Sequence, residues 1–163
     1  MIGVLAEHPR RGEVRARLVE LDERNVAVAR QAAQAAGLGG VEILQADAGT
    51  TDACAGAVPA QIVVVCGVFG NITAGDVQAT VAALPGLCAP GALVLWTRHR
   101  GAPDLTPAIR SWFGEAGFRE EAFDISQDGF MSVGAHRLTG EPAALIPGQR
   151  LFTFPGEGES GPR

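Results

Sequence analysis

The chain has 163 residues, of which 47% are hydrophobic and 19% charged, and its formal net charge is −5. This length suits one globular domain that buries roughly 70% of the surface of its unfolded chain, and the negative charge argues against nucleic acid as a partner. Cys54, Cys66 and Cys88 are an odd number without a C-x-x-C pair, which argues against a disulfide framework or a metal site. No apolar run reaches membrane-spanning length and the first residues lack the pattern of a secretory signal, so we expect a cytoplasmic protein without a membrane partner.

The first half of the chain predicts a strand, a helix and a second strand. Residues 2–8 fit either a helix or a strand, because so short an apolar run has no decisive periodicity. Residues 15–22 suit a buried parallel strand that ends in acidic residues. A helix over residues 23–36 stops before Gly37, a good helix terminator. The strand that follows ends just before Asp47 and covers residues 41–45.

The second half continues the alternation of strands and helices. A β-branched run over residues 60–67 predicts a central parallel strand covered on both faces. Thr73 and Asp76 resemble a capping box that opens a helix, and another helix begins at Thr106 and ends at Gly117. Further strands are expected at residues 92–97, 118–125 and 130–138, and a loop at residues 98–104.

This order of elements predicts an α/β fold with a doubly wound, mostly parallel sheet, finished by an antiparallel pair of strands. Residues 1–139 are expected to form one domain. Residues 140–163 form a Pro- and Gly-rich tail. Within the tail we expect residues 151–154 to dock on the domain and residues 156–163 to be disordered.

Several segments, taken in order, resemble the class I S-adenosylmethionine-dependent methyltransferases over roughly residues 1–138. The segments are LVELDERNVAVAR, LQADA, CGVFGNI, LCAPGALVLW, and AGFREEAF followed by SVGAHRL. Their specificity lies in order and spacing rather than in any single motif. The resemblance implies a Rossmann-like fold, S-adenosylmethionine as cofactor, and methyl transfer to an acceptor that we expect to be a small molecule.

The resemblance also implies where the cofactor binds. Glu20, at the end of the second strand of the family, takes the ribose hydroxyls, and Asp22 is the neighbour that can replace it. Asp47 lies near the adenine amino group. The full set of cofactor-binding residues that the resemblance implies is Glu20, Leu21, Asp22, Asp47, Ala48, Cys66 and Gly67.

Each of these residues also has a structural interpretation. Glu20 and Asp22 are acids at a helix N-terminus, where the helix dipole favours them. Asp47 is a type of residue that stabilises its own turn. Cys66 is expected to be a buried small hydrophobe rather than a nucleophile.

The candidate substrate residues are Phe69, Asn71 and His99, at the carboxyl ends of two expected strands, where parallel α/β sheets bind ligands. Their structural interpretations are a core residue, a turn residue and a solvated loop histidine. No catalytic residue is identified, because methyl transfer is a direct displacement that mainly needs donor and acceptor held in near-attack geometry. No metal is expected.

One feature departs from the family pattern: its first strand and G-x-G-x-G turn have no counterpart in this sequence. We therefore expect an N-terminally truncated chain, with a strand missing between the one ending at Glu20 and the one ending at Cys66. A homodimer is one expected way to cover that gap, and weak or absent activity is the expected consequence.

Two alternatives come from other functional classes. The first is a non-catalytic remnant or interaction module that keeps the methyltransferase fold without the glycine-rich turn. The second is an NAD-dependent oxidoreductase, since an acid on the second strand also binds the ribose of NAD. The proline-glycine turn and the terminal antiparallel pair count against the oxidoreductase.

Overall fold

The computed structural model describes residues 1–155, so the predicted disorder of residues 156–163 lies outside the described residues. The chain divides into two compact units, Met1–Ala57 and Val58–Arg163, which are described one at a time. The prediction of a single domain over residues 1–139 stays a prediction.

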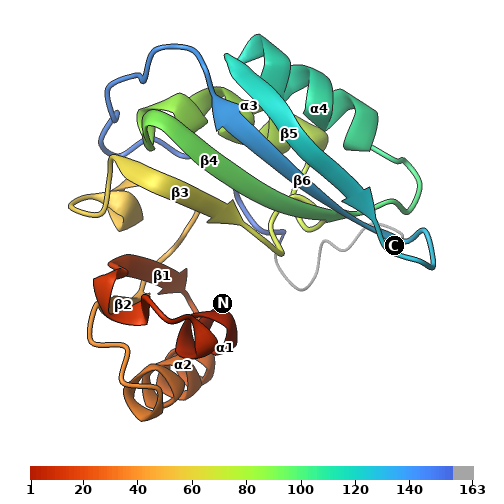
Figure 1. The fold of residues 1–163 in the computed structure, drawn as a ribbon. Helices are drawn as coiled ribbons and strands as arrows, with labels where there is room; N and C mark the ends of the chain where they lie inside the picture. The colour runs from red at the N-terminus through yellow and green to blue at the C-terminus, as the bar shows by residue number, and fades with distance from the viewer. Residues whose placement is uncertain (156–163) are drawn as a thin grey trace. The chain divides into compact units, whose positions relative to one another are not determined.

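The first unit contains a two-stranded parallel sheet and the helix that connects its strands (Figure 1). Strand β1, Ala16–Glu20, pairs with β2, Val41–Gln45, and helix α2, Glu23–Ala35, lies between them in sequence. The helix buries Val26 and Ala33 and is followed by Gly37, whose φ of 65° suits a helix terminator. Residues 2–8 resolve as a helix, α1, Ile2–Glu7. The other elements of this unit are the 3-10 turns η1, Arg11–Glu13, and η2, Thr51–Cys54.

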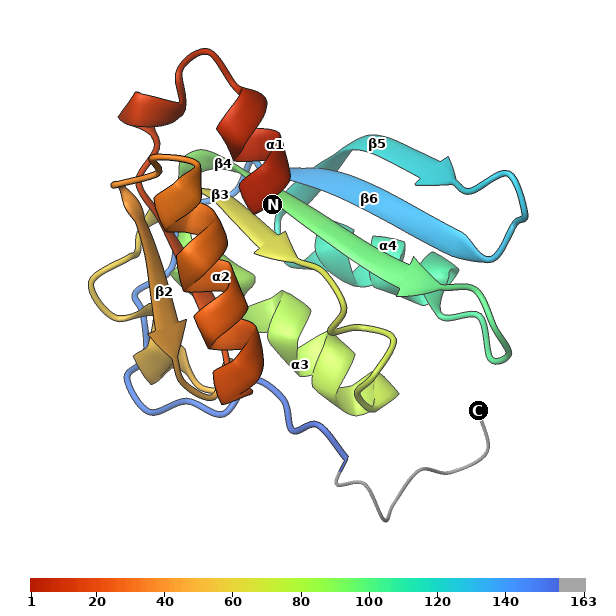
Figure 2. The ribbon, with the colours of Figure 1, turned by 90° about the horizontal axis from the view of Figure 1, so that it is seen from below.

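The second unit contains a four-stranded sheet in the order β3-β4-β6-β5. Strands β3 and β4 are parallel, whereas β4, β6 and β5 are antiparallel neighbours, which confirms the expected terminal pair. Helices α3 and α4 lie on the same face of this sheet (Figures 1 and 2). The elements are β3, Ala60–Val65; α3, Ala74–Ala83; η3, Leu84–Gly86; β4, Cys88–His99; α4, Thr106–Glu115; β5, Phe118–Ile125; and β6, Met131–Leu138.

Trp96 lies at the centre of the core of the second unit and has no exposed surface. Its indole stacks on Phe113 of α4 with 6.1 Å between ring centroids, and the ring of Phe69 lies at the same centroid distance in a tilted arrangement. Gly134 of β6 faces the indole, and a Cβ there would lie 2.2 Å from it, so only glycine allows this approach. Thr80 Oγ1 donates a hydrogen bond of 3.0 Å to Leu151 O, which confirms that residues 151–152 dock on the unit.

The structure corrects two expectations about strands. First, β3 pairs with β4 alone, and Ile62 is 60% exposed, so within residues 1–155 this strand is an edge rather than a central strand. Second, β4 is longer than predicted, because it continues through the proline-glycine turn at one end and through Arg98 and His99 at the other. Among the described strands none joins β1 to β3, which belong to separate sheets.

Candidate functional site

The carboxyl ends of β1 and β2 bring two of the predicted acidic residues to one edge of the first unit. The strands are parallel, with Glu20 opposite Gln45, and Asp47 follows Gln45 by two residues. The structure therefore places Glu20 and Asp47 at the same strand-end edge, as the sequence predicts. This is the edge at which open α/β sheets bind ligands.

Glu20 is the half-buried carboxylate of this edge. Its Oε1 accepts a hydrogen bond of 2.9 Å from the backbone N–H of Asp22, which fixes the side chain close to the backbone. No other hydrogen bond to this carboxylate comes from the described residues, so its second oxygen remains an acceptor for a ligand. Two vicinal hydroxyls are suitable donors for such an ionised acceptor.

Asp22 has a structural task that Glu20 lacks. It is the N-cap of α2: its Oδ1 accepts from the Arg24 backbone N–H at 2.8 Å, and its Oδ2 lies 2.9 Å from the Arg24 guanidinium. Hydrogen bonding to the Arg24 side chain lowers the pKa of the Asp22 carboxyl. Asp22 therefore fits its structural interpretation as an acid at a helix N-terminus. Leu21, between the two acids, is exposed.

Asp47 stabilises its own turn, as its structural interpretation expects. Its Oδ1 accepts from the Gly49 backbone N–H at 2.7 Å, and its carbonyl accepts from the Thr50 hydroxyl at 3.3 Å. Asp47 and Ala48 are half-buried. The turn fixes their position directly after β2 whether or not a ligand is bound.

The second unit has an equivalent edge where the parallel strands β3 and β4 end. The β3–α3 loop, residues 66–72, follows β3 and contains four of the predicted residues. Its Gly67 N–H donates to Thr97 Oγ1 at 3.2 Å, and Asn71 Nδ2 donates to Gly67 O at 2.7 Å. Asn71 thus closes the loop on itself, which fits its interpretation as a turn residue.

The exposure of two residues of this loop decides between their interpretations. Cys66 is exposed, not buried, because β3 ends at Val65 and Cys66 begins the loop. Phe69 has no exposed surface and packs on Trp96. This placement favours the core interpretation of Phe69 over a role as substrate wall.

His99 is not a solvated loop residue, because β4 extends to include it. The imidazole is half-buried and stacks on Phe130 with 5.8 Å between centroids. Its Nε2 lies 3.2 Å from Gly70 O, so it contacts the β3–α3 loop directly. Gly70 is needed for this approach, since a Cβ at that position would lie 2.8 Å from the His99 ring.

Sequence reasoning missed Arg98, which the alternation of β4 places on the helix-covered face together with Trp96. The residue is only 6% exposed, and its Nη1 donates to Phe69 O. Burial lowers the pKa of its guanidinium, while Asp104 opposes that shift. The sequence carried no alternating pattern that would signal its burial, because residues 92–96 are apolar throughout and the strand was expected to end at residue 97.

Sequence reasoning also found no partner for His136, which the structure places in the core at 1% exposure. Trp96 Nε1–H donates to His136 Nδ1 at 3.1 Å, so the proton of the neutral ring lies on Nε2. That atom is 3.6 Å from Glu120 Oε2, too far for a hydrogen bond. Burial lowers the pKa of His136. Its position within the core indicates a structural role.

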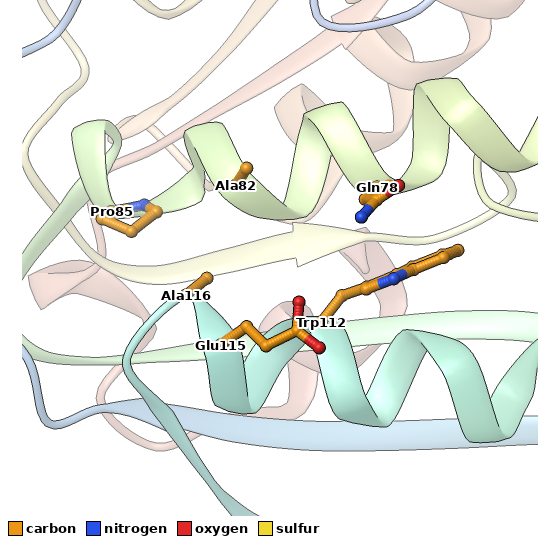
Figure 3. A pocket seen from close by; sticks show the side chains of 6 residues that line it. All are labelled: Gln78, Ala82, Pro85, Trp112, Glu115 and Ala116. Atoms are coloured by element: carbon orange, nitrogen blue, oxygen red, sulfur yellow. The ribbon is translucent and has the colours of Figure 1, made fainter.

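A surface hollow of about 320 Å³ lies between α3 and α4. Figure 3 shows its lining side chains, with the Trp112 ring beneath Gln78 and the small Ala82 and Ala116 side chains leaving space. Its lining residues include Pro85 just beyond α3 and Ala116 just beyond α4, positions next to the amino ends of β4 and β5. Within the second unit, the hollow thus lies at the end of the sheet opposite to the carboxyl ends of β3 and β4.

Residues 1–155 contain no helix that combines the length and apolar character needed to cross a membrane. In the same residues, no three or more His, Cys, Asp or Glu side chains are grouped so that they could hold a metal ion.

Comparisons with known proteins give matches at the level of structure only: no family model matches the chain, and no curated protein matches it. An O-methyltransferase family protein from Burkholderia thailandensis matches with a TM-score of 0.60 and 17% identity, over 86% of this chain and 56% of its own. Magnesium protoporphyrin IX methyltransferase from Synechocystis PCC 6803, solved with bound SAH, matches with a TM-score of 0.58 and 14% identity, over 77% of this chain and 64% of its own. The [4+2]-cyclase SpnF matches with a TM-score of 0.57 and 11% identity, over 80% of this chain and 67% of its own.

These matches show that the chain has the Rossmann-like fold of class I S-adenosylmethionine-dependent methyltransferases, which confirms the predicted fold class. The chain spans about half of the length of the Burkholderia protein. At such identities the likeness shows the fold, and the function is argued from the residues.

Proposed function

We propose that the protein is an S-adenosylmethionine-dependent methyltransferase whose acceptor is a small molecule. The observation that carries the proposal is the half-buried Glu20 carboxylate, at the carboxyl end of β1 in a methyltransferase fold, with one oxygen available to a ligand. In this assignment Glu20 accepts hydrogen bonds from the cofactor ribose. Asp47 and Ala48 contact the adenine, and Cys66 and Gly67 contact the methionine part.

Methyl transfer requires the donor and the acceptor to be held in the right geometry more than it requires a catalytic acid or base. The acceptor atom would attack the methyl carbon of the sulfonium in line with the departing sulfur. The bond from acceptor to carbon would form as the carbon–sulfur bond breaks, S-adenosylhomocysteine would leave as a neutral thioether, and a proton on the acceptor atom would pass to water. A protein accelerates this step mainly by holding the two reactants in near-attack geometry. A carboxylate on the ribose and an ordered loop on the acceptor side supply that geometry.

Calorimetric titration with S-adenosylhomocysteine tests the cofactor assignment, with NADH fluorescence as the comparison. We expect heat of binding with S-adenosylhomocysteine and no change in NADH fluorescence. The reverse result would establish the oxidoreductase alternative, to which the structural comparisons lend no support.

The acceptor side is assigned to the β3–α3 loop and the end of β4. We predict that Asn71→Ala and His99→Ala lower the rate of methyl transfer and leave the affinity for S-adenosylhomocysteine nearly unchanged, because this assignment places both side chains on the acceptor side. Initial rates and calorimetry on the same preparations measure both quantities. A parallel loss of cofactor affinity would move these residues into the cofactor site or the fold.

A second candidate function is a protein that keeps this fold without transferring methyl groups. One observation favours it: a [4+2]-cyclase shares the fold. S-adenosylhomocysteine binding without methyl transfer to any acceptor tested would support this candidate over the enzyme.

A further inference from the structure

Three consecutive residues at the end of β4 hold the β3–α3 loop. Thr97 Oγ1 accepts from the Gly67 N–H at 3.2 Å, Arg98 Nη1 donates to Phe69 O, and His99 Nε2 lies 3.2 Å from Gly70 O. Side chains of successive strand residues point to opposite faces of a sheet. Side chains on both faces of the sheet therefore bind the loop, at the carboxyl end of β4.

Arg98 is the unusual member of this group, because it is a buried cation with few partners. The residue is 6% exposed, and its Nε makes no hydrogen bond to any of the described residues. The acid that favours its charged form is Asp104, whose carboxylate accepts hydrogen bonds from Arg100 and Thr106. Burying a charge that is incompletely paired costs folding free energy.

The carbonyl that Arg98 holds belongs to the residue that already anchors the loop in the core. The Phe69 ring is fully buried against Trp96, so this side chain fixes the middle of the loop to the core. The hydrogen bond from Arg98 then fixes the direction of the Phe69 peptide group. Cys66 and Gly67 on one side of Phe69 and Asn71 on the other are set by this arrangement.

We propose that Arg98 is a positioning residue, retained at a cost in stability because it fixes the β3–α3 loop in the form that receives the methyl acceptor. The inference rests on the proposed function for its account of what the loop receives. Arg98 itself touches neither cofactor nor acceptor in this account.

Two measurements on one variant distinguish a positioning role from a structural one: the exchange rate of the loop amides and the melting temperature. The Arg98→Met variant keeps the length of the side chain and removes the charge. We expect the amides of Gly67 and Asn71 to exchange about ten- to a hundredfold faster, as for the loss of a hydrogen bond from a charged donor. The melting temperature should stay unchanged or rise, because replacing an incompletely paired buried charge by an apolar group is often neutral or stabilising.

Two further variants complete the experiment. Arg98→Lys keeps a charged donor and should restore part of the loop protection. Thr80→Val is the matched control, because it removes another buried hydrogen bond from a side chain to a backbone carbonyl, that of Thr80 to Leu151. This control should lower the melting temperature and leave the exchange of the loop amides as it was.

The outcomes separate this inference from the proposed function, since amide exchange needs no ligand. Unchanged loop exchange in Arg98→Met, or a loss of melting temperature or folding, overturns the positioning role and makes Arg98 a structural residue. Where methyl transfer is measurable, a higher KM for the acceptor in Arg98→Met than in the wild type supports the role. If Arg98→Met loosens the loop but the wild-type chain binds no S-adenosylhomocysteine, the proposed function is overturned. The acceptor part of this inference is then overturned as well.

Discussion

At the scale of single residues, the structure gives a physical reason for preferring Glu20 to its neighbour Asp22 as the acid that binds the ribose. Asp22 is bound to the start of α2 and to Arg24, whereas Glu20 makes one hydrogen bond to the Asp22 backbone. Residue type and position alone allow both acids to bind a ribose. The side-chain contacts decide the order of preference, because a carboxylate already engaged on both oxygens has less capacity for a ligand.

The core histidine gives a residue-scale prediction about pH. Desolvation lowers the pKa of His136 in the folded protein from its ordinary value of 6.5. Below about pH 6.5 the unfolded chain binds a proton that the folded chain excludes, so the contribution to stability is complete above that pH and decreases on acidification. We expect the wild-type chain to lose stability between pH 7.5 and pH 5.

Replacing His136 by glutamine tests whether this residue causes the loss of stability at low pH. His136→Gln keeps an acceptor for Trp96 Nε1–H and removes the titrating group. Urea unfolding at the two pH values should show a smaller loss of stability in His136→Gln than in the wild type. An identical loss in both proteins would assign the pH dependence to other groups.

At the scale of elements, the sequence signals that worked were local ones. The cap at Thr73, the terminators Gly37 and Gly117, and the periodicity of α2 each act within a few residues, so they predicted α2, α3 and α4 well. Pairing partners are not local. The open edge of β3 and the extra residues at both ends of β4 depend on which strands lie alongside, and the sequence of one strand does not contain that information.

The same limit applies to the site. Glu20, Asp47 and the β3–α3 loop could be located from the sequence because each lies at the end of a strand or within two residues of it. Arg98 was missed and His99 was assigned to a loop, because both depend on how far β4 extends. The exposure of Cys66 depends likewise on β3 ending at Val65.

The cap of α3 gives a prediction at this scale. Thr73 Oγ1 accepts from the Asp76 backbone N–H at 3.1 Å. Thr73→Ala should lower the free energy of unfolding by about 1 kcal/mol, and Thr73→Ser should restore most of it, since serine is an equally good cap. Urea unfolding of the three proteins measures this order. Equal stabilities would show that α3 is held by packing of Val77 and Val81 alone.

At the scale of the whole molecule, the edge strand β3 predicts association. Its sequence contains no charge, it pairs on one side only, and Ile62 and Val64 are 60% and 39% exposed. Exposed, uncharged edges are templates for pairing with another chain. We expect the protein to form dimers in a concentration-dependent manner.

A charge placed on the edge should prevent this association. Ile62→Lys is the test variant, and Val133→Lys is the control, because Val133 is exposed on β6, which is paired on both sides. Light scattering across a dilution series should show Ile62→Lys as a monomer and Val133→Lys like the wild type. A wild-type chain that stays monomeric at its solubility limit would refute the association.

The central claim, that a methyltransferase fold binds its cofactor through Glu20, is tested most directly by calorimetric titration of S-adenosylhomocysteine into three proteins. Hydrogen bonds to a charged acceptor contribute roughly 1.5 to 3 kcal/mol, so Glu20→Ala should weaken binding about ten- to a hundredfold relative to the wild type. Asp22→Asn, which keeps an N-cap for α2, should weaken it much less. The reverse ranking would move the ribose to Asp22, and equal affinities in all three proteins, or no binding by any of them, would contradict the account.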